Sequence, residues 1–210
     1  MSEKPVKIGT VILSSPTRYI HVLREGIFAL IFNWGMEMYY VDEVKGVRQT
    51  MKKKFTLPQE SLKLFQVPLP FDNILNVFFE EEIKDSKSFA LWVIEVECFE
   101  KEVKYSKPLR VYEIAGYQRD NTRVDNYSKS IFLLNIGNDI LAIRKGYVID
   151  TASVSIQAGS NYLRYISNNR LIHLTDIKVE LYSFTVNENV HPPRIVVTSM
   201  DSIVIDSLRK

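Results

Sequence analysis

The residues best suited to chemistry in this chain are its cations and its tyrosines. Arginines and lysines recur beside tyrosines between residues 117 and 170, and three consecutive lysines occupy residues 52–54. Barrels that bind single-stranded nucleic acid combine such groups, stacking bases on rings and following phosphates with cations. The alternation therefore suggests a nucleic-acid interface made of Lys52, Lys53, Lys54, Arg119, Arg123, Arg144 and Lys145. Tyrosine also suits half-buried strand positions, so nucleic-acid binding by a β-barrel is an alternative hypothesis.

Residue patterns of known catalytic and cofactor sites are missing from the sequence. The three histidines lie far apart, without an HExxH or HxH pattern: His21, His173 and His191. The single cysteine, Cys98, excludes an intramolecular disulfide and a cysteine-based zinc site, and its apolar surroundings predict a buried, inert thiol. The glycines form no phosphate-binding loop, and no GxSxG motif supplies a serine nucleophile. The sequence therefore predicts a protein that is not an enzyme and that uses no cofactor and no metal.

Charge and hydropathy narrow the class of protein further. The 210 residues carry a net charge of +2, with 25% charged and 46% hydrophobic residues. A protein whose main work is to neutralise phosphates usually has a basic excess across the whole domain. The N-terminus lacks the apolar core of a signal peptide, and the longest apolar run, residues 27–32, is too short to span a bilayer. We expect a protein of the cytoplasm, or of a virion assembled there, that is neither secreted nor membrane-bound.

The elements that position these residues are predicted to be strands. In residues 177–186 polar and apolar side chains alternate with the period of two that is typical of extended chain. Short Gly- and Asn-containing turns separate this segment from its neighbours. The predicted strands are 6–13, 18–25, 27–32, 36–41, 89–99, 109–117, 130–136, 140–144, 147–157, 161–166, 170–174, 177–186 and 194–205. Many short strands at this spacing predict a mainly β protein built as an antiparallel sandwich or barrel.

The middle of the chain predicts one or two short helices. Thr56 is a suitable N-cap with Pro58 in the first turn, and Ile74, Val77 and Phe78 recur at helical spacing after Asp72. The expected organisation is an N-terminal β region at 1–55, a short helical insert at 56–87 and a β-sandwich or barrel at 88–210. We expect these regions to form one compact domain.

Several predicted strands near the C-terminus carry apolar residues on both faces. In an isolated antiparallel sheet one face is expected to be polar and exposed to solvent. The second face must then pack on another element or another subunit, and a long exposed edge would need a capping partner. The residues assigned to an assembly interface are Tyr182, Phe184, Val186, Ile195, Val197, Ile203 and Ile205. We therefore expect a homo-oligomer that also contacts other proteins of the same particle.

Three C-terminal segments carry a resemblance to a known family. IHLTDIKV at 172–179, YSFTV at 182–186 and PPRIVVTSMDSIVI at 192–205 resemble the end of bacteriophage tail-tube and baseplate-tube proteins. The resemblance implies a sandwich that assembles into rings and catalyses nothing. The segment IGTVILSSPT at 8–17 resembles the small barrel that precedes the motor of archaeal DNA-translocating ATPases, although no Walker motif follows it. Our leading hypothesis is a non-enzymatic structural subunit of an oligomeric assembly, such as a viral tail or another virion component.

Overall fold

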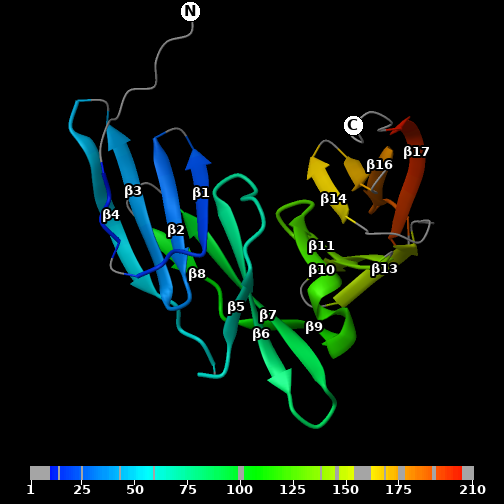
Figure 1. Ribbon diagram of the computed structural model, residues 1–210, viewed down its shortest axis with the longest axis horizontal. Helices are drawn as coiled ribbons and strands as arrows, with labels where there is room; N and C mark the ends of the chain where they lie inside the picture. Colours follow the sequence, from blue (N-terminus) through cyan, green and yellow to red (C-terminus); the bar gives the residue numbers. More distant parts are fainter. Residues whose placement is uncertain are drawn as a thin grey trace, which may run out of the picture. The chain divides into compact units, whose positions relative to one another are not determined.

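The protein is mainly β, as predicted, and its strands form four separate antiparallel sheets (Figure 1). The computed structural model describes residues 10–13, 15–24, 26–42, 44–58, 60–98, 102–137, 139–144, 147–153, 162–167, 169–174, 178–190 and 193–204. Within these ranges none of the four sheets closes into a barrel. The chain divides into two compact units, residues 1–79 with 94–108 and residues 80–93 with 109–210. The division between the units crosses two long strands of the second sheet, at residues 79/80 and 93/94. It therefore differs from the predicted boundaries at residues 55/56 and 87/88.

The first sheet is a meander of four strands in chain order. Tight turns join them, and Gly26 and Gly46 take the positive φ values of 72° and 73° that favour glycine. A side chain at Gly35 would collide with the carbonyl oxygen of Lys53, so glycine lets the last two strands approach each other. The strands are β1 (Tyr19–Arg24), β2 (Ile27–Phe32), β3 (Gly35–Asp42) and β4 (Gly46–Lys54).

The second sheet occupies the region in which helices were predicted, and that prediction is wrong. Residues 74–80 are all buried, so this apolar run is a strand covered on both faces, whose sequence periodicity cannot be told from that of a buried helix. The segment around Thr56 forms an extended connection and a turn instead of a capped helix. The strands are β5 (Lys63–Gln66), β6 (Ile74–Ile83), β7 (Ser88–Cys98), β8 (Val103–Tyr105) and β9 (Leu109–Ala115), which pairs with β7.

The third and fourth sheets lie in the second unit and share one hydrophobic core. A short 3-10 helix, η1 (Gly116–Asn121), precedes them. The third sheet contains β10 (Thr122–Asn126), β11 (Ile131–Ile136), β12 (Asp139–Arg144) and β13 (Tyr147–Ser153). The fourth contains β14 (Tyr162–Ser167), β15 (Arg170–Leu174), β16 (Lys178–Asn187) and β17 (Arg194–Val204). Asn169 takes a φ of 58° in the β14–β15 turn, as an Asn-Asn hairpin turn requires.

Candidate functional site

The predicted lysine run lies on β4, an edge strand of the first sheet. We call its four cations the basic edge: Arg48, Lys52, Lys53 and Lys54. Lys52 Nζ lies 2.9 Å from Oε1 of the buried Glu37 and 4.9 Å from the centre of the Trp34 ring. Desolvation raises the pKa of Glu37, but the hydrogen bonds from Lys52, Tyr39 and Gln49 and the charge of Lys52 together hold the pKa below its usual value.

Aromatic rings hold two further cations of the basic edge. The Arg48 guanidinium lies 5.4 Å from the centre of the Tyr40 ring, and Lys53 Nζ lies 5.7 Å from that of Tyr105. Lys54 is exposed to solvent. Since cations are attracted to the faces of aromatic rings, three of the four side chains have defined positions along the strand.

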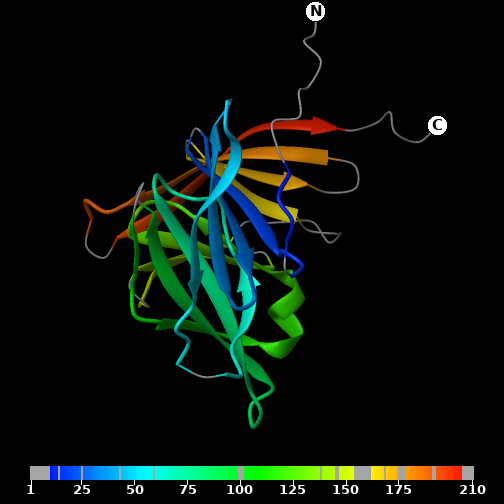
Figure 2. The same cartoon turned by 90° about the vertical axis from the view of Figure 1, so that its left-hand side faces the viewer.

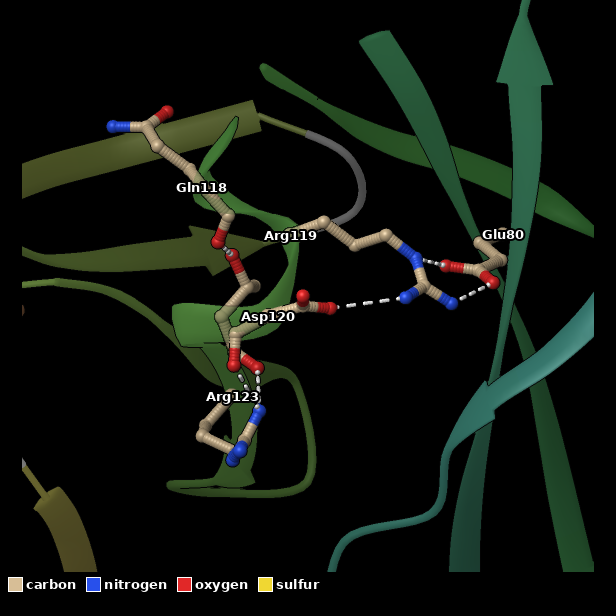
Figure 3. Close-up of polar contacts among 6 residues, drawn as sticks. Glu80, Gln118, Arg119, Asp120 and Arg123 are labelled. Atoms are coloured by element: carbon tan, nitrogen blue, oxygen red, sulfur yellow. Dashed lines mark hydrogen bonds and ion pairs between the residues drawn. The ribbon is translucent and has the colours of Figure 1, made fainter. Parts of the chain in front are cut away.

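Arg119, another predicted phosphate contact, is paired with a carboxylate of its own chain (Figure 3). Its guanidinium donates hydrogen bonds of 2.7 and 2.5 Å to the two oxygens of Glu80, whose side chain is only 7% exposed. It also lies 3.1 Å from Oδ1 of Asp120 and 5.3 Å from the centre of the Phe89 ring. These contacts tie η1 to β6 and β7 within the second unit. The Glu80 carboxylate raises the pKa of Arg119, which therefore stays charged but is not free for a ligand.

The remaining predicted nucleic-acid contacts also have partners within the chain or lie outside the described residues. Arg123 donates to the backbone carbonyls of Asp120 and Thr122, and Arg144 pairs with Glu188. Lys145 lies outside the described residues. The structure therefore divides the described members of the predicted set between the two units, and among them Lys52, Lys53 and Lys54 form a continuous run.

Most of the predicted assembly residues pack in a core inside the chain. Phe184 is 0% exposed and contacts Tyr127 and Tyr165 edge-on, with ring centres 5.7 and 6.0 Å away. The core of the second unit includes Phe184 and Val186, with Tyr182, Ile195 and Val197 packed against it. We call these five residues, together with Leu171, the inner face of the fourth sheet. The sheet β10–β13 of the same chain packs on these residues, whereas the prediction was that another subunit packs on them.

The opposite side of the same sheet, which we call the outer face, mixes apolar and polar side chains. Strand alternation and pairing register place six apolar residues there: Ile172, Leu174, Val179, Leu181, Val196 and Ile203. The same register places Arg170, Ser183, Thr185, Thr198 and Asp201 among them. Val196 is 47% exposed and Ile203 is 64% exposed, while the other four are partly buried. Figure 2 shows β17, drawn in red, at one edge of this sheet. Of the predicted interface residues, Ile203 lies on this outer face, and Ile205 lies outside the described residues.

A charged cluster lies on the inner side of the β15–β16 hairpin, around Glu180. Lys178 Nζ lies 2.5 Å from Oε1 of Glu180, His173 Nδ1 lies 2.8 Å from Oε2, and the Tyr182 hydroxyl donates to Oε2 over 3.1 Å. The hydrogen bond from Lys178, followed by that from His173, lowers the pKa of Glu180 to about 2. His173 is 1% exposed, and Nε2 of its ring has no hydrogen-bond partner.

The cluster makes the stability of the fourth sheet depend on pH. Because the pKa of Glu180 is lower in the folded state than its usual value of 4.5, its contribution is complete above that value. We expect the free energy of unfolding to fall as the pH decreases from about 5 towards 2. Urea unfolding at several pH values should show a shallower fall for Glu180→Gln than for the wild type. Equal slopes for the two proteins would show that Glu180 does not carry this dependence.

The other candidate reactive residues are isolated in the structure. Cys98 is buried at the end of β7, as predicted, and desolvation raises the pKa of its thiol to about 12. His21 is buried on β1, where desolvation lowers its pKa, and His191 lies outside the described residues. In the part of the chain that the structure describes, no three His, Cys, Asp or Glu side chains come together as metal ligands. No helix among the described residues is long and apolar enough to cross a membrane.

In the described residues the fold consists of three four-stranded meander sheets and one five-stranded sheet, which follow one another along the chain. No family model and no curated protein matches the chain. Among solved structures it is similar to Kluyveromyces lactis Hsv2p, with 7% identity, a TM-score of 0.44 and coverage of 93% of this chain and 76% of that chain. Another structure of Kluyveromyces lactis Hsv2 has 8% identity, a TM-score of 0.45 and coverages of 93% and 75%. Hsv2 from Kluyvelomyces marxianus has 7% identity, a TM-score of 0.42 and coverages of 92% and 74%.

Two features of the candidate surfaces were missed by sequence reasoning. The lysine run was recognised, but β4 was not predicted as a strand, although Val47, Gln49 and Met51 alternate. Of the six apolar residues of the outer face, the predicted interface included only Ile203, because alternation defines two faces without saying which one the chain itself covers. The signal for it was Val179 and Leu181, which alternate with the core residues of β16.

Proposed function

We propose that this chain is a non-enzymatic structural subunit that assembles with further copies of itself through the outer face of its fourth sheet. The observation that carries the proposal is the exposure of Val196 and Ile203 on a face that has six apolar side chains among its polar ones. The inner face of the same sheet is buried in this way, because β10–β13 packs against it. Burying a second face of this kind removes further apolar area from water, which favours association.

The edge strands favour association through a sheet face over edge-to-edge pairing of strands from two copies. The basic edge places charge along β4, and lysines on an edge strand discourage unselective pairing. β17 begins beside β13, where the backbone N–H of Ile195 donates to Asp150 over 2.7 Å. The apolar face is then the surface that a further copy covers. The viral setting stays a prediction from the resemblance of the C-terminal segments alone.

Size-exclusion chromatography with light scattering tests the proposal at micromolar concentration. We expect the wild type to form a defined oligomer and the Val196→Lys, Ile203→Lys double variant to shift to the monomer, since two buried charges oppose association. Both side chains are exposed in the single chain, so the variant should remain folded by circular dichroism. Val190→Lys, at an exposed loop position of the same unit, is the matched control and should leave the oligomer intact.

The contrary results are equally specific. A wild type that stays monomeric throughout this concentration range would refute self-assembly. An oligomer that the double variant leaves unchanged would place the interface elsewhere on the molecule.

A further inference from the structure

We propose that the basic edge binds an extended acidic peptide segment, which adds to the first sheet as a further strand beside β4. The inference is independent of the proposed assembly, because the basic edge and the outer face belong to different units.

The first support is the availability of the strand. β4 is nine residues long and ends the β1–β2–β3–β4 order, and among the described strands it pairs only with β3. Most of its residues are exposed. A strand at the edge of a sheet presents unpaired N–H and C=O groups, to which an extended peptide can add.

The second support is charge. β4 carries four cations and no carboxylate, and Lys52 is already neutralised by Glu37. Arg48, Lys53 and Lys54 therefore remain to attract an anionic partner. An added strand places its side chains on alternate faces, so acidic residues at alternate positions would meet cations on one face of the sheet.

The third support is the fixed position of the cations. It distinguishes an edge that binds a ligand from an edge whose lysines only prevent aggregation. Lysines that only discourage aggregation need no fixed position, yet rings hold Arg48, Lys52 and Lys53 at 5.4, 4.9 and 5.7 Å. Cations held in place before binding lose less conformational freedom when a ligand arrives. A register shift between Met38 and Tyr39 leaves Thr50 unpaired, and such bulges re-aim the side chains that follow.

The same rings argue for a peptide over a nucleic acid. Binding of single strands uses open aromatic faces on which bases stack. The rings of Trp34, Tyr40 and Tyr105 each already have a cation over one face. A nucleic acid also has no backbone amides with which to pair the outer groups of β4.

Fluorescence anisotropy with a labelled peptide of alternating glutamate and valine tests the inference. We expect the full chain to bind it. The Arg48→Glu, Lys53→Glu variant should lose about tenfold or more in affinity, because these two cations pair with Tyr40 and Met36 on one face of the sheet and two attractions become repulsions. A second peptide with proline in place of each valine keeps the charge but cannot form the backbone ladder, and it should bind at least about tenfold more weakly. Lys63→Glu, Lys107→Glu is the matched control, because both lysines are exposed outside β4 in the same unit, and it should bind like the wild type.

Three results would overturn the inference. The β4 variant could bind the peptide as the wild type does while circular dichroism shows both folded. The two peptides could bind equally, which would indicate attraction without strand addition. A labelled oligothymidylate could bind more tightly than the peptide and be lost in the same variant, which would indicate a nucleic-acid site.

Discussion

Phe184→Ala is expected to lower the free energy of unfolding of the second unit by about 3–5 kcal/mol. The ring is 0% exposed and is enclosed by Tyr127, Tyr165 and the apolar residues of two sheets. Its removal leaves a cavity between rigid sheets that cannot collapse without breaking other contacts. Chemical denaturation followed by tyrosine fluorescence and far-ultraviolet circular dichroism measures the change.

A control variant and the opposite outcome distinguish a core position of Phe184 from a position between subunits. Tyr147→Ala removes a ring of the same unit that is largely exposed, and it should change stability by no more than about 0.5 kcal/mol. If Phe184→Ala left the unfolding transition unchanged and only dissociated an oligomer, the ring would lie between subunits, as sequence reasoning first indicated.

Arg119→Ala is expected to lower the free energy of unfolding by about 2–3 kcal/mol, because it leaves the buried Glu80 carboxylate without its two hydrogen bonds. The Arg119 side chain is 38% exposed, so most of the loss comes from Glu80 and not from the arginine. Glu80→Gln combined with Arg119→Ala should recover part of the loss, since no charge is then buried alone.

Arg123→Ala is the matched control for this pair. Arg123 donates to two backbone carbonyls at the end of η1, and its removal should cost less than about 1 kcal/mol. A loss for Arg119→Ala no larger than that of Arg123→Ala would show that the Glu80 pair adds nothing to stability. Unchanged stability together with lost oligonucleotide binding would return Arg119 to the phosphate-binding role first considered for it.

The strands of the last third of the chain were predictable because their polarity alternates and their turns contain glycine or asparagine. The predicted 170–174 agrees with β15 residue for residue, and 177–186 ends one residue before β16 does. Outside that third, the predicted 27–32 agrees with β2. The apolar run of β6 was not predictable as a strand, because a segment buried on both faces shows no alternation. The basic edge, too, was predictable only in part. The lysine run is visible in the sequence, but its position on an edge strand is not.

Local sequence determined where the alternating strands extend and turn, since alternation and positive-φ residues act between near neighbours. Tertiary structure alone decided which apolar face is covered, because Phe184 and Val179 are equally apolar alternate residues of β16 and only the packing of β10–β13 distinguishes them. It also decided which cations are already paired: Arg119 meets Glu80 across 39 positions of chain, a distance over which no local pattern can report.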